Sequence, residues 1–292
     1  MTKQKLNFLF PILLLFLCLA FPSVCASGAK NGLAISLKMA FPALFPSLIL
    51  SGMITQTLPF QKRNSAVWIP FILGILCGFP VGAKAVCDLY QKGHLSRKDS
   101  ENMLFFCNNA GPAFLICFVG QGLFFDTKKG VFLFLMQSAI SLICFLCFLG
   151  KRKLKKEKDG EKISLSTSSY FLVFRNALVD AANSFIYITS CIVFFSFFAN
   201  LILHLFPLTE KWASFIVLFL EMTNGIEKTA NAFSSLALPL CALGCGWAGV
   251  SVHLQTIGPI SESGLAMKKY LLGKLFFALM MFLGALFFQK LL

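Results

Sequence analysis

The sequence predicts an all-α polytopic membrane protein, and three observations support this fold class. Hydrophobic residues make up 57% of the 292-residue chain, and its mean hydropathy is +0.78. Apolar runs long enough to cross a hydrocarbon core of roughly 30 Å recur along the chain. They cover Leu6–Ala26, Leu33–Leu58, Gly130–Gly150, Phe171–Phe206 and Tyr270–Phe288. The runs lack the period-two alternation of a membrane β-barrel, so we expect about 6–7 transmembrane helices.

The basic residues give the chain a net charge of +14, and their placement explains this charge. They gather in short segments between apolar runs, as the positive-inside rule predicts for cytoplasmic loops. The strongest cluster is "KRKLKKEKDGEK" at 151–162. A membrane protein that interacts with the lipid bilayer therefore accounts for the charge, and we expect no nucleic-acid partner.

Four segments follow from this pattern. Residues 1–27 form an N-terminal transmembrane helix or signal-anchor; cleavage near "SVCASGA" is an alternative. Residues 28–150 form a first membrane repeat, and residues 171–292 form a second. A basic cytoplasmic linker, residues 151–170, separates the two repeats.

The motif "GFPVGAK" (Gly78–Lys84) interrupts an apolar segment at 66–90. If that segment crossed the membrane, the basic cluster at 151–162 would lie outside. If it turns at the motif and returns, Lys62, Lys92, the cluster, and Lys274 with its neighbours all lie inside. Glycine and proline suit a tight turn. The charge rule therefore favours a re-entrant hairpin.

The second half repeats this plan. A break at "EMTNG" (Glu221–Gly225) follows the helix at 171–206, and a Gly-interrupted crossing comes next. Gly82 and Gly225 lie about 140 residues apart, as do the Ala-Gly pairs at 110–111 and 248–249. Three crossings and one hairpin per half place the halves in opposite orientation. We therefore expect an inverted-topology repeat with two re-entrant hairpins and broken helices, as in many transporters.

The broken segments carry the candidate binding residues. Non-helical backbone at membrane depth must be buried in protein or line a wet cavity. Half-helix N-termini favour anions. The predicted substrate-binding residues are Gly78, Pro80, Gly82, Lys84, Asn108, Asn109, Gly111, Pro112, Glu221, Thr223, Asn224, Gly225, His253 and Gln255.

Five of these side chains have definable chemistry. Lys84 offers a point charge to an anion, although pairing with Asp88 is an alternative. Asn108 and Asn109 can cap a half-helix or contact a ligand. Glu221 either binds a proton or coupling ion, or pairs with Lys84. His253 is either a proton relay or a buried core residue.

Several functional classes lack a signal. The sequence has no Gly-rich phosphate cradle, no nucleophile elbow and no zinc signature, and no catalytic pair stands out. Most of the 11 cysteines lie in apolar runs, where they act as small hydrophobes. We therefore expect no metal, no cofactor and no enzymatic activity.

The motifs "GFPVGAK", "FCNNAGPAFLI", "EMTNGI" and "GVSVHLQ" resemble the sporulation integral membrane protein family YlbJ. That family belongs to the nucleoside-recognition, or Gate domain, membrane proteins. The similarity runs from about Gly32 to about Lys274. It implies a bacterial membrane protein of endospore formation that exports dipicolinic acid from the mother cell across the outer forespore membrane.

From the residues alone, the cargo is a small solute, with an anion favoured. Dipicolinate, a planar dicarboxylate, is the cargo that the resemblance implies. The alternatives are a nucleoside or other small-metabolite permease, and a non-transporting spore-assembly protein. The sequence leaves the energy source and the oligomeric state open, and a homo-oligomer is one alternative.

Overall fold

A computed structural model describes residues 3–57, 66–152 and 169–289, and its regular structure over these ranges is helical throughout. This confirms the predicted all-α class. Helical stretches long and apolar enough to cross a membrane number five within the described ranges. They are Pro22–Thr57, Thr127–Lys151, Tyr170–Leu205, Ala237–Ser263 and Lys268–Phe288, and Phe8–Ala20 and Ala113–Leu123 are shorter apolar helices. The chain therefore has the helices of a multi-pass membrane protein.

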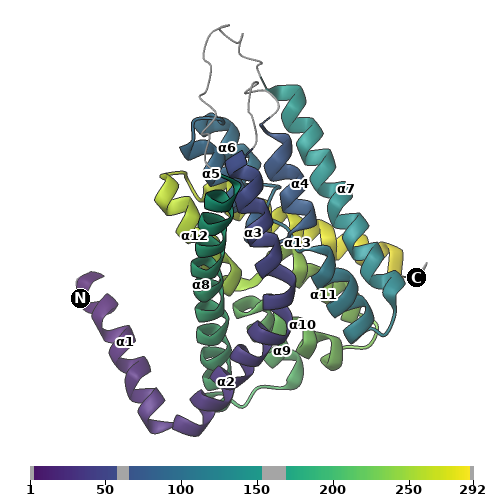
Figure 1. Cartoon of the computed structure of the whole chain (residues 1–292). Helices are drawn as coiled ribbons and strands as arrows, with labels where there is room; N and C mark the ends of the chain where they lie inside the picture. Colours follow the sequence, from purple (N-terminus) through teal and green to yellow (C-terminus); the bar gives the residue numbers. More distant parts are fainter. Residues whose placement is uncertain (1–2, 58–65, 153–168, 290–292) are drawn as a thin grey trace, which may run out of the picture.

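The N-terminal helices differ from the predicted boundaries. The apolar run at 6–26 is divided, because α1 (Lys3–Ala20) ends before Pro22, which begins α2 (Pro22–Ile35). Proline suits the first turn of a helix, where its missing N–H is not needed. Figure 1 shows α1 splayed away from the other helices, whereas α2 packs along α8. The second span thus begins at Pro22 rather than at Leu33.

A π-helical turn, η1 (Ser36–Ala40), joins α2 to α3 (Phe41–Thr57) without a break in the helix. Pro42 lacks the N–H that would bind the carbonyl oxygen of Lys38. The local widening accommodates this loss, and the Phe41 N–H bonds back to the Ser36 carbonyl. π-Helical turns are frequent at functional sites.

The remaining helices of the first half are shorter, except for the last. They are α4 (Trp68–Leu76), α5 (Val81–Gln91), α6 (Arg97–Met103), the π-helix η2 (Ala113–Leu123) and α7 (Thr127–Lys151). A turn at Cys77–Pro80, with Gly78 at φ +81°, joins α4 to α5, which pack together. Residues 108–111 are non-helical.

The second half has the same order of elements. A long helix, α8 (Tyr170–Leu205), precedes two short helices, α9 (Glu210–Leu220) and α10 (Met222–Ala232), which pack together. Next come α11 (Ala237–Trp247) and α12 (Gly249–Ser263), separated by Ala248, and the long α13 (Lys268–Phe288). Each half therefore contains a helical pair, an interrupted helix and a closing helix.

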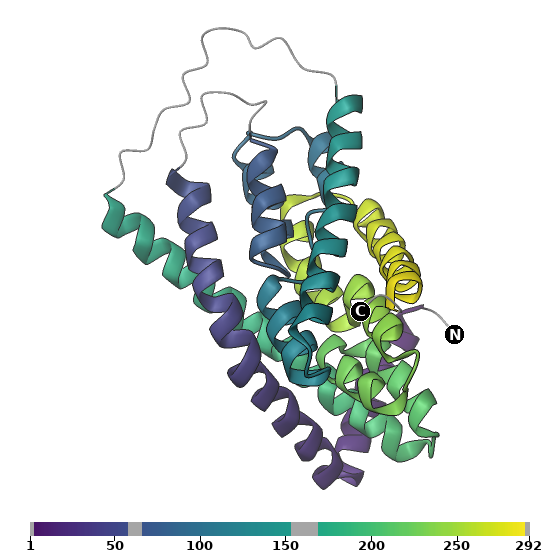
Figure 2. The same cartoon turned by 90° about the vertical axis from the view of Figure 1, so that its right-hand side faces the viewer.

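The described ends that flank the basic linker lie at one end of the bundle. Figure 2 shows the end of α3, the start of α4, the end of α7 and the start of α8 at that end. Lys62, Arg63 and most of the segment 151–170 lie outside the described residues. These helix ends therefore lie at the same end of the bundle, while the re-entrant hairpins and the side of the membrane stay predictions.

One residue in that count was assigned wrongly. Lys274 lies in α13, six positions after its start, and is only 1% exposed. It is therefore an interior residue and not a loop lysine. Its neighbours Lys268 and Lys269, at the start of the helix, are exposed and half-buried.

The core joins the two halves. Phe71 of α4 stacks on Phe145 of α7, with ring centroids 4.1 Å apart, in a cluster that includes Tyr270 and Phe277 of α13. A second cluster joins Phe79 of the first half to residues of α9–α13. Because both clusters cross between halves, neither half buries its apolar surface alone.

Candidate functional site

Each interrupted helix lies against the tip of the helical pair in its own half. A Cβ atom built on Gly111 would lie 3.2 Å from the Cys77 carbonyl oxygen, in the turn between α4 and α5. A Cβ atom on Gly249 would lie 3.0 Å from the Met222 nitrogen, at the start of α10. The structure therefore brings each predicted break into contact with a predicted tip.

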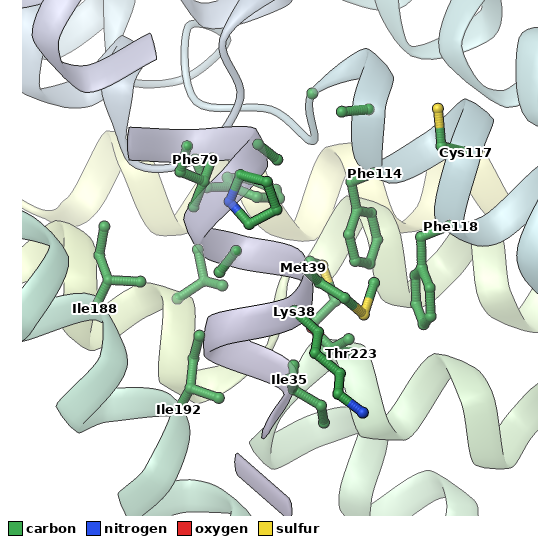
Figure 3. Close-up of a pocket in the computed structure, with 18 of the residues that line it drawn as sticks. Ile35, Lys38, Met39, Phe79, Phe114, Cys117, Phe118, Ile188, Ile192 and Thr223 are labelled. Carbon is green, nitrogen blue, oxygen red and sulfur yellow. The ribbon is translucent and has the colours of Figure 1, made fainter. Parts of the chain in front are cut away.

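A cavity of about 530 Å³ opens where these elements meet. Its wall is largely apolar and includes Phe79 at the first tip. Figure 3 shows Phe114 and Phe118 of η2 on one side and Ile188 and Ile192 of α8 on the other. The wall also contains polar and charged side chains, which are those of Lys38, Glu221, Thr223 and Gln255. A mainly apolar pocket with a few placed polar groups is typical of a small-molecule site.

Lys38 is the cationic side chain of this wall, and it was not among the predicted site residues. It lies on the π-helical turn in the middle of the span Pro22–Thr57, and Figure 3 shows it beside Ile35, Met39 and Thr223. An ionisable residue in the middle of a membrane span is costly, by about 3 kcal/mol on insertion scales, and is usually functional. Its isolation within the apolar run at 33–58 was a signal that sequence analysis could have used.

Glu221 lies at the second tip and is 2% exposed. Its carboxylate accepts hydrogen bonds from the backbone N–H groups of Thr223 (3.1 Å) and Asn224 (2.8 Å), so it caps α10. The positive end of the α10 dipole stabilises this charge. Half-helix N-termini were expected to favour an anion, and at this one the anion is the protein's own carboxylate.

Lys84 lies outside the wall of this cavity. Its ammonium donates a 2.8 Å hydrogen bond to Ser184 Oγ on α8. Among the described residues, no ion pair joins Lys84 to Glu221 or to Asp88. The ion pair considered between Lys84 and Glu221 is therefore not formed, while a role for Lys84 in transport stays a prediction.

The side chains of the asparagines in the first break bond to other groups of the protein and do not cap η2. Asn109 Nδ2 donates to the Phe106 carbonyl at 2.8 Å, and Asn108 Nδ2 donates to Thr256 Oγ1 at 3.1 Å. The N-cap of η2 is Pro112, which has no side-chain hydrogen bond to offer. Of the two alternatives for these asparagines, capping of η2 is therefore not formed, and contact with a ligand stays a prediction.

A buried polar network continues from Asn108 toward His253. Tyr270 OH donates to Thr256 Oγ1 at 3.4 Å and lies 2.9 Å from His253 Nδ1. Two atoms of this network, Asn108 Oδ1 and His253 Nε2, are buried without a hydrogen-bond partner. Tyr270 and Thr256, both absent from the predicted site, connect α12 and α13 to the first break.

Several of the remaining predicted residues contact other helices of the protein. Asn224 accepts from Asn31 Nδ2 (2.9 Å) and donates to Ser196 Oγ (3.0 Å), which ties α10 to α2 and α8. Gly82 packs against the Cys107 carbonyl, and Gly225 packs against the backbone of Leu218. Of the 14 predicted residues, those in the cavity wall are Gly111, Glu221, Thr223 and Gln255. Within the described ranges, no three His, Cys, Asp or Glu residues cluster in a way that could hold a metal ion.

The chain is similar to "Sporulation integral membrane protein YlbJ" of Bacillus subtilis (strain 168). The two are 23% identical over an alignment 335 residues long. The alignment covers 94% of this chain and 81% of the relative. This similarity confirms the predicted resemblance to the YlbJ family. No protein-family model matches the chain, and no solved structure matches it. A YlbJ-like chain with several apolar helices is a multi-pass integral membrane protein related to a sporulation protein.

Proposed function

We propose that the protein transports a small anionic solute through the membrane, with dipicolinate as the first candidate. The observation that carries this proposal is the cavity between the two tips, which combines an exposed lysine from the middle of an apolar helical span with an aromatic wall. Lys38 supplies a positive charge for a carboxylate. The Phe79, Phe114 and Phe118 rings supply flat apolar surface for an aromatic ring.

The cellular setting is also part of the proposal. The relative is a sporulation integral membrane protein, and this chain has the same membrane character. The resemblance to the YlbJ family implies export of dipicolinate from the mother cell across the outer forespore membrane, and we include this step in the proposal. We place the chain in that membrane as a transporter without enzymatic activity.

An inverted-topology repeat supports transport, because such repeats form a site at the interface of their two copies. The matched order of elements, and the contact of each break with the tip in its own half, favour this arrangement. In this topology, α4 and α5 enter from the cytoplasmic side and return, whereas α9 and α10 do so from the opposite side.

Thiol labelling of intact cells tests that topology, after the exposed native Cys117 and Cys147 are replaced. The replacements Phe125→Cys and Trp212→Cys are expected to react with a membrane-impermeant maleimide, because both side chains are well exposed at the predicted outer side. Arg97→Cys is expected to react only after permeabilisation. Reaction of all three positions from the same side would contradict the inverted repeat.

Flux of labelled dipicolinate into proteoliposomes tests the transport itself. The wild-type protein is expected to carry it, and Lys38→Met is expected to reduce uptake at least about tenfold, the loss that follows from about 1.4 kcal/mol of binding. Lys30→Met is the matched control, since Lys30 is exposed like Lys38 and lies on the same helical stretch, but is outside the cavity wall.

Two outcomes would contradict the proposal, and a third would revise its site. Uptake of labelled uridine without uptake of dipicolinate would favour a nucleoside permease, in which Thr223 and Gln255 contact the nucleoside. Absence of flux for every solute tested, with protein that is monodisperse and folded, would favour a non-transporting assembly protein. Normal uptake by Lys38→Met would remove Lys38 from the site.

A further inference from the structure

The first break contains a backbone carbonyl that binds a cation of the protein itself. Lys274 of α13 directs its ammonium to the carbonyl oxygen of Asn108, in the non-helical stretch 108–111. Carbonyls of unwound backbone at membrane depth are the groups with which transporters bind coupling cations. Here the cation is a side chain from the other half of the chain.

The surroundings of the ammonium favour a monovalent cation. Lys274 Nζ lies 4.5 Å from the centroid of the Phe79 ring and 5.8 Å from that of Phe277. The quadrupole of an aromatic ring attracts a cation over its face, most strongly where water is excluded. Within the described residues, Lys274 has no carboxylate partner in an ion pair. Carbonyl oxygen and ring faces therefore surround the ammonium group.

Asn108 adds a second indication. Its side chain is 1% exposed, and its Oδ1 atom is buried with no hydrogen-bond partner. A buried acceptor without a donor is unfavourable and is uncommon in native proteins. The break thus holds more acceptor capacity than its own donors use.

We propose that the first break forms a monovalent-cation site, built from the Asn108 carbonyl and the Phe79 and Phe277 rings, and that the protein fills this site with the ammonium of Lys274. The tethered cation joins α13 to the break and to the first tip. Phe79 also lines the cavity, so the cation fixes one part of the cavity wall. Removal of the tether leaves an empty site that a small free cation fills.

Thermal unfolding of the purified full-length protein in detergent tests this proposal without any transport substrate. In choline chloride, whose cation is too large for the site, Lys274→Ala is expected to unfold at least about 5 °C below the wild type, from the size of a charged hydrogen bond. Equimolar methylammonium chloride is expected to recover part of that shift, with saturation. Two controls are the wild type and Lys268→Ala, which replaces an exposed lysine of the same helix. Each is expected to have the same unfolding temperature in the two salts.

Lys274→Met provides a test if the alanine variant does not fold. Methionine fills the space without a charge, so this variant is expected to be less stable than the wild type and unresponsive to methylammonium. An unfolding temperature equal to or above that of the wild type would overturn the proposal, because the lysine would then be no more than a tolerated buried charge. A methylammonium effect of equal size in Lys274→Ala and in the wild type would also overturn it. Because no outcome uses flux, failure here leaves the transport proposal intact.

Discussion

The two interrupted helices satisfy their backbone groups in different ways. In the first, side chains from distant helices bind the open backbone: Gln137 of α7 donates to the Ala110 carbonyl at 2.8 Å and accepts from the Ala110 N–H at 3.3 Å. In the second, the interruption is a kink of two residues, Ala248 and Gly249, both at φ +76°. The Ala248 N–H bonds to the Gly244 carbonyl at 2.7 Å, within the same helix end.

The first break is therefore supported by tertiary contacts, and the second by contacts within its own helix. The first break depends on Gln137, Ser141 and Lys274, which come from the closing helices of both halves. The second depends on a short-range bond and on a left-handed residue, which is unfavourable for Ala248 because of its Cβ atom. Substitutions distant in sequence should therefore affect the first break and leave the second unchanged.

The largest expected effect tests a feature that the two halves share, which is a close backbone approach at a glycine in the second helix of each helical pair. A Cβ atom on Gly82 would overlap the Cys107 carbonyl, and one on Gly225 would overlap the Leu218 backbone. We expect Gly82→Ala and Gly225→Ala to lower the free energy of unfolding by about 3 kcal/mol or more, because backbone cannot move aside cheaply.

Gly150→Ala is the matched control for this pair, since no atom lies within 4 Å of the added Cβ. The yield of monodisperse protein in fluorescence-detected size-exclusion chromatography measures the effect. A normal yield for one of the two variants would show that the halves do not share this packing.

An intermediate effect is expected from Gln137→Leu, which removes support from the first break alone. The N–H and carbonyl groups of Ala110 would both lose their side-chain partner, at a cost of about 2–4 kcal/mol. Thermal unfolding in detergent measures the loss, with Gln121→Leu, an exposed glutamine of η2, as the control. Equal stability of Gln137→Leu and the wild type would mean that the first break is supported locally, like the second.

The smallest effect is expected from Glu221→Gln, at the second tip. A glutamine retains one acceptor oxygen and loses the negative charge, so it weakens the α10 cap by about 1 kcal/mol. The same unfolding measurement applies, with Glu210→Gln in the exposed first turn of α9 as the control. A stability above that of the wild type would show that the buried charge costs more than the cap contributes.

The sequence by itself determined where the helices are interrupted, because the causes are local. Gly78 takes a left-handed φ, and Pro80 is the N-cap residue of a new helix, α5. Asn108 to Pro112 interrupt a helix by their own backbone preferences. For the same reason the long apolar runs correspond to α7, α8 and α13 within a few residues.

Only the tertiary structure decided which charges face which surroundings. Lys84 was the expected anion contact, yet it bonds to Ser184 on α8, while Lys38 lines the cavity. Lys274 was counted as a loop residue, because the charge rule uses position along the chain and not the face of a helix. The ammonium groups of Lys84 and Lys274 bond to residues 100 and 166 positions away in the sequence. Such contacts form only when separate helices pack, so the spacing of residues along the sequence carries no information about them.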